Sequence, residues 1–343
     1  MRTIVRWGLA ACAAAVLDVA AGAVALANDT SAQLATGGLV LTKTDAIEMK
    51  SEDLSISEKL VHVRYVFENT SGRDASVLVA FPLPDITIEG PDDNIVVPTE
   101  SPTNFLGFVT TVDGRVVDAQ VEQKVIKDGV DETAYLRELG IPLAPQLPST
   151  AAALLKLPLA TQTALKAKGL AIDDDYDVGK GMEHHLQPTW TLKTTYYWRQ
   201  GFPAGKPVVV DHRYRPSVGG TAGTEWGDPA YKTQPGYAQG RAKYCIDDSL
   251  LASLAQKRAA AQKTGGYYAE ERIQYVLTTG ANWKAPIGDF TMTIDKGSTG
   301  NLVSFCGDRV KKIGPTTFQV HYANFTPTRD VAILLLVPET FAP

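Results

Sequence analysis

VHVRYVFENTSGRDASVLVAFPLP, residues 61–84, carries the clearest structural signal in this 343-residue chain. The odd positions from Val61 to Phe67 are apolar, and most of the even positions between them are polar. A period of two is typical of a β-strand with one buried face. A turn and a second apolar strand follow, and that strand stops at Pro82 and Pro84 because proline cannot donate a backbone hydrogen bond.

Similar patterns follow this stretch along the chain. Apolar segments around Asp113-Gly114 predict a tight hairpin, because an Asp-Gly pair readily adopts positive φ angles. Aromatic residues alternate from Trp190 to Trp198, and short apolar runs recur up to Val337. Strands joined by turns, with few crossover helices, favour antiparallel sandwiches. The sequence therefore predicts a mostly β fold of two antiparallel sandwich-like halves, with a helical insertion in the first half and one helix in the second.

Composition suggests where these halves begin and end. Residues 129–187 combine a Pro-rich linker, an Ala/Leu/Lys-rich stretch and an acidic patch, which indicates a helical insertion in a first domain over 28–216. Residues 217–240 are rich in Gly, Pro and Thr and are expected to form a long loop. The second sandwich-like region covers 241–343, with its helix at 250–263.

The first 27 residues are typical of a secretory signal peptide. Arg2 and Arg6 precede an apolar run over residues 9–26, and Ala25-Leu26-Ala27 fits a small-residue cleavage site. The mature chain is then expected to begin at Asn28, in a periplasmic or secreted protein.

Two alternatives to this cleavage remain. An uncleaved membrane anchor is disfavoured by Asp18, since a carboxylate inside a bilayer is costly. The segment ending at Cys12 resembles a lipobox, so a lipid anchor there is the second alternative. The later apolar run over 331–337 is too short to cross a bilayer, so no transmembrane segment is expected after cleavage.

The net charge and the cysteine content argue against one class of partner and predict one covalent bond. The formal net charge is −5 and no basic stripe is present, which disfavours nucleic acid as a partner. Without Cys12 the chain keeps Cys245 and Cys306, and an even pair in an exported protein predicts a disulfide. Two buried thiols are the alternative.

The strongest candidate for a metal site is His184-His185 near Asp175 and Asp177, because imidazoles and carboxylates bind divalent metals. A solvated polar loop is the preferred interpretation, since adjacent histidines on a strand point to opposite faces and the aspartates lack EF-hand spacing. His212 falls on the apolar face of its strand, where a hydrogen-bonded core histidine is expected.

Other chemistry is weakly indicated. Trp190, Tyr196 and Trp198 share a face and are expected to fill the core, which leaves Tyr197 facing outward as a weak binding candidate. The sequence has no nucleophile elbow, P-loop or His-Glu-x-x-His motif, and no cofactor is expected.

Several ordered blocks resemble the bacterial domain-of-unknown-function family 4424 over nearly the whole mature chain. They are Phe81-Pro-Leu-Pro-Asp, Thr194-Thr-Tyr-Tyr-Trp, His212-Arg-Tyr-Arg-Pro-Ser-Val-Gly-Gly, Leu277-Thr-Thr-Gly-Ala-Asn-Trp and Val303-Ser-Phe-Cys-Gly. The resemblance implies an envelope protein with no assigned activity.

The first half is also loosely similar to VIT domains, the modules shared by vault and inter-alpha-trypsin inhibitor proteins. Phe81-Pro-Leu-Pro, Phe108, Asp113-Gly-Arg115, Glu122 and Tyr135 follow the order of that pattern, and the chain departs from it after Tyr135. This resemblance implies a β-rich interaction module.

The leading functional hypothesis is a non-catalytic binding module whose partner is another envelope protein or polymer. The insertion is expected to carry the partner surface and to contribute little to the core, because long excursions from a scaffold are often functional. The alternative is that Leu154, Leu155, Leu165 and Leu170 pack on a sheet. The competing hypothesis is a metal-dependent hydrolase using His184 or His185 with the nearby aspartates.

Overall fold

The structure is a computed structural model that describes residues 28–35, 38–90, 93–177 and 179–340. The expected signal peptide and the lipobox at Cys12 lie outside the described residues. Within the described part, no helix is both long enough and apolar enough to cross a membrane.

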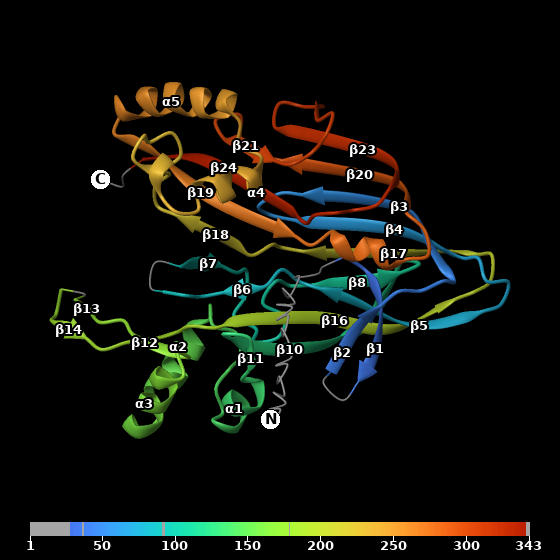
Figure 1. Ribbon diagram of the computed structural model, residues 1–343, viewed down its shortest axis with the longest axis horizontal. Helices are drawn as coiled ribbons and strands as arrows, with labels where there is room; N and C mark the ends of the chain where they lie inside the picture. The colour runs from blue at the N-terminus through green and yellow to red at the C-terminus, as the bar shows by residue number, and fades with distance from the viewer. Residues whose placement is uncertain (1–27, 36–37, 91–92, 178, 341–343) are drawn as a thin grey trace, which may run out of the picture.

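The chain forms three large sheets, and the mostly β prediction is confirmed (Figure 1). The first sheet has seven strands: β11 (Val130–Asp131), β10 (Gln120–Lys127), β16 (Thr191–Phe202), β5 (Ala75–Pro82), β1 (Thr30–Ala35) and β2 (Gly38–Thr42), with β6 (Ile86–Thr87) paired to β16.

The second sheet has eight strands and the third has five. In order, the second sheet contains β22 (Lys311–Lys312), β23 (Thr317–Phe325), β20 (Ile287–Asp295), β3 (Ile47–Ile56), β4 (Val61–Asn69), β17 (Pro207–Tyr214), β8 (Val109–Val112) and β9 (Arg115–Val117). The third contains β21 (Leu302–Phe305), β24 (Val331–Thr340), β19 (Gly266–Tyr275), β18 (Val218–Thr221) and β7 (Asn94–Val96).

Residues 61–82 connect two of these sheets. Alternate residues of β4 are completely buried, namely Val61, Val63, Tyr65 and Phe67. Strand β4 belongs to the second sheet, whereas the next strand, β5, belongs to the first sheet. Asn69 holds the turn between them, because its amide donates to the carbonyl oxygens of Arg73 and Phe202 at 2.8 and 2.7 Å. This segment therefore forms an arch, in which the chain passes from the second sheet to the first.

The second sheet contains strands from both halves of the sequence. β20 pairs in parallel with β3, and β23 pairs with β20 on the other side. Strands β3 and β4 form an antiparallel hairpin, and the hairpin at Asp113-Gly114 joins β8 to β9 as expected. The parallel pairing of β3 with β20 links segments more than 200 residues apart, so the two halves share one sheet.

Helices cover two sides of the sheets (Figure 1). Helices α1 (Thr133–Glu138), α2 (Pro148–Leu155) and α3 (Leu159–Ala167) lie in the insertion with two short hairpins, β12 (Ala171–Asp173) with β15 (Leu186–Pro188) and β13 (Tyr176–Asp177) with β14 (Met182–Glu183). On the other side are α4 (Tyr237–Tyr244) and α5 (Asp248–Gln262).

The second half contains more regular structure than the sequence predicted. The expected helix is α5, whose first turn is capped by Asp247 accepting from the Leu250 amide at 2.7 Å. Residues 217–240, expected as a loop, instead contain β18, the 3-10 helix η1 (Tyr231–Thr233) and the start of α4. Trp226 and Tyr237 anchor this segment in a second apolar cluster beneath α4 and α5.

The insertion is part of the main hydrophobic core, so the prediction that it contributes little to that core is wrong. Leu136, Leu154, Leu165 and Leu170 are fully buried in the same cluster as the residues of the three sheets. Trp190, immediately before β16, donates its indole N–H to the Leu143 carbonyl at 2.8 Å. The apolar spacing of the helices therefore reflects packing, as in the alternative considered above.

Candidate functional site

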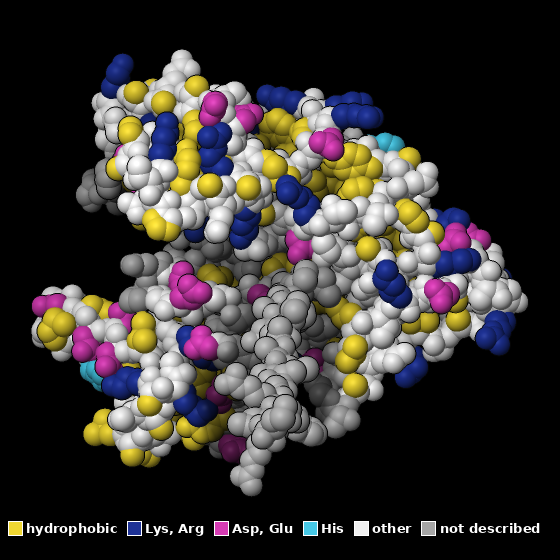
Figure 2. All heavy atoms as spheres, in the orientation of Figure 1, with side chains coloured by type: hydrophobic (Ala, Val, Ile, Leu, Met, Phe, Trp, Pro, Cys, Tyr) yellow, Lys and Arg dark blue, Asp and Glu magenta, His cyan; other side chains and the backbone are white. Residues whose placement is uncertain are grey.

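Among the described residues, a groove of about 980 Å³ lies between the second and third sheets. Strands β20 and β23 form one side, β21 and its following loop form another, and the start of α5 closes an end. Figure 2 shows hydrophobic side chains gathered over β20, β21 and β23. Its larger apolar lining residues are Leu250, Leu277, Phe290, Met292, Val303, Phe305, Val310, Phe318, Val320, Tyr322, Phe325 and Val331.

Aromatic rings build one wall of the groove. The rings of Phe290 on β20 and of Tyr322 and Phe325 on β23 are stacked, with interplanar angles of 2 to 28° and centroids 4.7 to 6.2 Å apart. Phe290 is buried beneath, whereas Tyr322 and Phe325 are partly exposed. Stacked rings of this kind give a rigid apolar surface that loses little conformational entropy on binding.

The groove runs beside an open sheet edge. Strand β22 covers β23 only at Phe318 and Gln319, so residues 321–325 have no partner strand on their outer side within the described chain. Residues 322–326 line the groove consecutively, which places their backbone along it. An unpaired strand edge offers backbone N–H and C=O groups to another chain.

The polar rim of the groove is held in place by covalent and hydrogen bonds. Cys245, at the end of α4, is bonded to Cys306, which follows β21, so the predicted disulfide is confirmed. The Tyr322 hydroxyl accepts from the Asp308 amide at 2.7 Å. Asp330 accepts from the amides of Leu277 and Thr278 at 3.0 and 3.1 Å. These contacts hold the loops at the rim of the groove in place.

A second feature is a buried polar cluster between the sheets. His212 on β17 is fully buried, as expected for a core histidine, and its Nε2 lies 3.0 Å from Asp29 Oδ1. Its Nδ1 lies 3.0 Å from the Thr110 hydroxyl. Burial raises the pKa of Asp29, and the charge of His212 lowers it.

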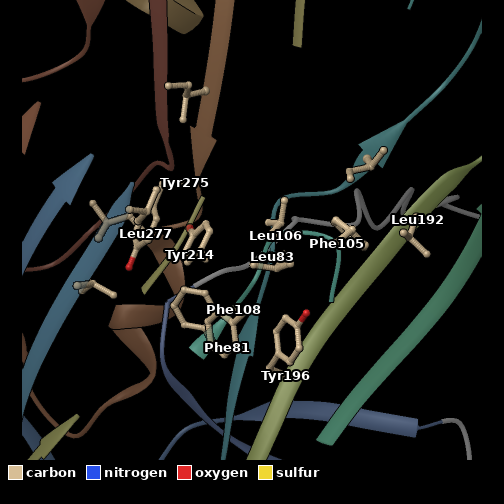
Figure 3. Packing of buried hydrophobic residues seen from close by; sticks show 14 of the residues in the cluster. Phe81, Leu83, Phe105, Leu106, Phe108, Leu192, Tyr196, Tyr214, Tyr275 and Leu277 are labelled. Atoms are coloured by element: carbon tan, nitrogen blue, oxygen red, sulfur yellow. The ribbon is translucent and has the colours of Figure 1, made fainter. Parts of the chain in front are cut away.

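Glu52 on β3 belongs to the same cluster. Glu52 Oε2 accepts from the side-chain Nδ2 of Asn28 at 2.9 Å, and the Tyr65 and Tyr275 hydroxyls are hydrogen bonded to each other at 2.9 Å. Burial raises the pKa of Glu52, a hydrogen bond from the Asn28 side chain lowers it and the charge of Asp29 raises it, and the net result is a pKa of about 8. Figure 3 shows Tyr275 and Tyr214 close to Phe81 and Phe108 in the surrounding core.

Sequence reasoning missed Glu52, although a signal was present. Glu52, Leu54 and Ile56 alternate on β3, and all three are buried. A period of two places a carboxylate in line with apolar residues, which marks it as a buried charge.

The proposed metal ligands do not come together as a metal site. His184 Nδ1 lies 2.7 Å from Asp175, while the His185 ring stacks on Tyr176 with centroids 4.2 Å apart. Asp177 instead accepts from the amides of Gly179 and Gly181. Across the described residues, no group of three or more His, Cys, Asp or Glu side chains is arranged to hold a metal ion, so the geometry gives the hydrolase hypothesis no support.

The aromatic strand β16 is arranged as the alternation predicted. Trp190, Tyr196 and Trp198 are buried, and Tyr197 is partly exposed on the opposite face of the first sheet. Tyr197 lies between Gln120 and Ala80 of the neighbouring strands, outside the groove. Its role as a binding residue stays a prediction.

Comparisons with known proteins place the chain in a family. The model of DUF4424, a domain of unknown function, matches residues 27–334. No curated protein matches. The similarity of the first half to VIT domains stays a prediction.

Solved structures offer weaker similarities. A "putative nutrient binding protein" from Legionella pneumophila is 16% identical with a TM-score of 0.42, over 90% of this chain and 70% of that one. An M1 zinc metallopeptidase from Deinococcus radiodurans is 9% identical with a TM-score of 0.20, over 86% of this chain and 43% of the peptidase. This chain therefore spans less than half of the peptidase, and neither similarity carries a functional argument.

Proposed function

This chain belongs to the DUF4424 family, and on that premise we propose that it is an exported, non-catalytic binding protein of the envelope. The groove beside β23 is its binding site. The occupant is an extended segment of a partner protein with apolar residues at alternate positions. Export is supported by the signal-peptide pattern and by the disulfide between Cys245 and Cys306.

The single observation that supports this site best is the open edge of β23 along an apolar groove. An extended peptide can add a strand to such an edge, where backbone hydrogen bonds supply affinity and alternate side chains supply specificity. Every second side chain of the added strand faces the same way as Tyr322 and can enter the groove. A mostly apolar concavity with a few fixed polar groups is typical of a binding site.

Fluorescence anisotropy with a labelled ten-residue peptide tests this proposal. The peptide alternates valine or phenylalanine with lysine or threonine, and a second version carries N-methylated backbone amides that cannot pair with β23. Val310→Asp places a charge in the groove, and Val116→Asp is the matched control, because Val116 is 75% exposed on β9, outside the groove.

The proposal expects saturable binding that weakens at least about tenfold with Val310→Asp and with the N-methylated peptide, and that is unchanged by Val116→Asp. Equal binding of both peptides contradicts strand addition. Binding of the apolar dye N-phenyl-1-naphthylamine in the groove, with no binding of either peptide, indicates a small apolar ligand and overturns the proposed occupant.

The insertion remains a second candidate partner surface. Leu159, Tyr176 and Met182 are exposed there, with 78%, 45% and 70% of their surface accessible. These side chains would supply the apolar contact area for a partner that binds the insertion. A Leu159→Ser/Met182→Ser double variant that stays folded and loses capture of an envelope partner would favour the insertion over the groove.

A further inference from the structure

The polar cluster in the core includes the residue at which the mature chain is expected to begin. Asn28 is fully buried, and its backbone N–H donates to the Thr279 hydroxyl at 2.5 Å. The same hydroxyl donates to the Asn28 carbonyl at 2.7 Å. A side chain at position 280 would displace Asn28, because a Cβ on Gly280 would lie 2.7 Å from Asn28 Nδ2.

The cluster has a charge imbalance. Asp29 is paired with His212, but no Lys, Arg or His of the described residues forms an ion pair with Glu52. Glu52 is only 1% exposed, so its ionised form has neither solvent nor a cation to stabilise it. Three oxygens in the cluster, Glu52 Oε1, Asp29 Oδ2 and Asn28 Oδ1, are buried without a hydrogen-bond partner.

We propose that removal of the leader after Ala27 turns the backbone nitrogen of Asn28 into a buried ammonium group that serves as the counter-ion of Glu52. The inference rests on the export proposed above and concerns a different site from the groove. Leader cleavage would then complete the fold as well as release the protein.

The chemistry is peptide hydrolysis by a leader peptidase of the exporting cell. One water molecule is consumed, the Ala27–Asn28 bond breaks, a carboxylate remains on Ala27, and the amine on Asn28 takes up a proton. The new ammonium has three N–H groups, whereas the amide has one. The Thr279 hydroxyl already accepts one N–H, and Glu52 Oε1 and Asn28 Oδ1 are unpaired acceptors in the same cluster.

Cleavage therefore adds one positive charge where one is missing. Before cleavage, Glu52 must stay protonated or be buried as an unpaired carboxylate. After cleavage, an ion pair with Asn28 removes that penalty. Breaking a buried pair by removing one partner is strongly destabilising, because the other charge is left uncompensated.

The test moves the amine without changing the core. Gly-Ser-Gly is inserted between Ala27 and Asn28, so that the exported chain begins three residues earlier and its amine lies up to about 10 Å away. The wild-type and inserted chains are made with Glu52, Glu52→Gln or the matched control Asp53→Asn, since Asp53 is adjacent but exposed. Intact mass verifies each N-terminus, and urea unfolding gives the equilibrium constant.

The expected result is that the insertion raises the unfolding constant at least about tenfold with Glu52 or Asp53→Asn, and less than about threefold with Glu52→Gln. An insertion effect that is absent, or equal with Glu52→Gln, overturns the inference.

As a second measurement, the Asn28 amine of the wild type should resist acylation by an N-hydroxysuccinimide ester under native conditions, and rapid labelling there contradicts burial of the amine. A purified chain that keeps its leader contradicts the export proposal itself, whereas loss of peptide binding at the groove leaves this inference unchanged.

Discussion

His212 shows how single residues in this protein depend on their partners. Both ring nitrogens are paired, and the ring lies among aromatic side chains, with centroids 4.7 Å from Phe81 and 5.2 Å from Phe108. The sequence predicted the buried position of His212 from the period of β17. It could not predict Asp29 as the partner, because the two residues are 183 positions apart.

Replacing His212 should therefore lower the free energy of unfolding by more than the loss of one hydrogen bond would. His212→Phe keeps an aromatic ring but leaves the Asp29 carboxyl buried without a partner, so we expect a loss of about 3–5 kcal/mol in the free energy of unfolding. Combining it with Asp29→Leu should cost less than the sum of the two single changes. Urea unfolding of the four chains measures this coupling, and additive losses would contradict a direct pair.

Glu52 should make stability depend on pH when the amine of Asn28 is moved away. Because burial raises the Glu52 pKa from its usual 4.5 to about 8, the folded chain binds more protons than the unfolded chain between these values. The contribution of Glu52 to the free energy of unfolding is then fully present below pH 4.5 and is lost as pH rises to about 8, by at most about 1.4 kcal/mol per pH unit.

Other groups around Glu52 must be separated from this effect. Asp29, whose pKa is also raised, acts in the same direction, His212 faces the same cluster, and burial raises the pKa values of Tyr65 and Tyr275 well above this range. Urea unfolding of the Gly-Ser-Gly chain from pH 4 to 9, with and without Glu52→Gln, isolates the contribution of Glu52. If the fall in stability with rising pH persists with Glu52→Gln, it comes from the neighbouring groups and not from Glu52.

At the scale of elements, the local sequence pattern predicted where the strands lie better than it predicted which strands pair with each other. Alternation identified β4, β16 and β17, a continuous apolar run ended by prolines identified β5, and the Asp-Gly pair identified the turn between β8 and β9. The local sequence could not predict the parallel pairing of β3 with β20, because a period of two determines the buried face of a strand but not its partner strand.

The insertion illustrates the same limit for helices. Its leucines indicated helices, but their spacing alone could not show whether they face a sheet or a partner. Leu154 is fully buried, and Leu159, five positions later, is 78% exposed. We expect Leu154→Ala to lower the free energy of unfolding by about 2–5 kcal/mol and Leu159→Ala to change it by less than about 0.5 kcal/mol. Thermal or urea unfolding measures both, and equal small effects would show that the insertion is not part of the core.

At the scale of the whole molecule, one hydrophobic cluster joins the three sheets and the insertion. The groove lies where the second and third sheets meet, so its walls come from segments that only the complete fold brings together. None of its aromatic residues was identified from the sequence as a binding residue, since each occupies an ordinary strand position. The candidate site could not be predicted for that reason, although the disulfide at its rim could.

The central claim is that an extended partner segment pairs with the free edge of β23. Hydrogen–deuterium exchange of the intact protein, with and without the alternating peptide, measures this directly. The account predicts slower exchange for outward-facing amides within residues 321–325 when the peptide is bound, and no change at β9, an edge strand outside the groove. Bound peptide that leaves exchange at residues 321–325 unchanged would contradict the account.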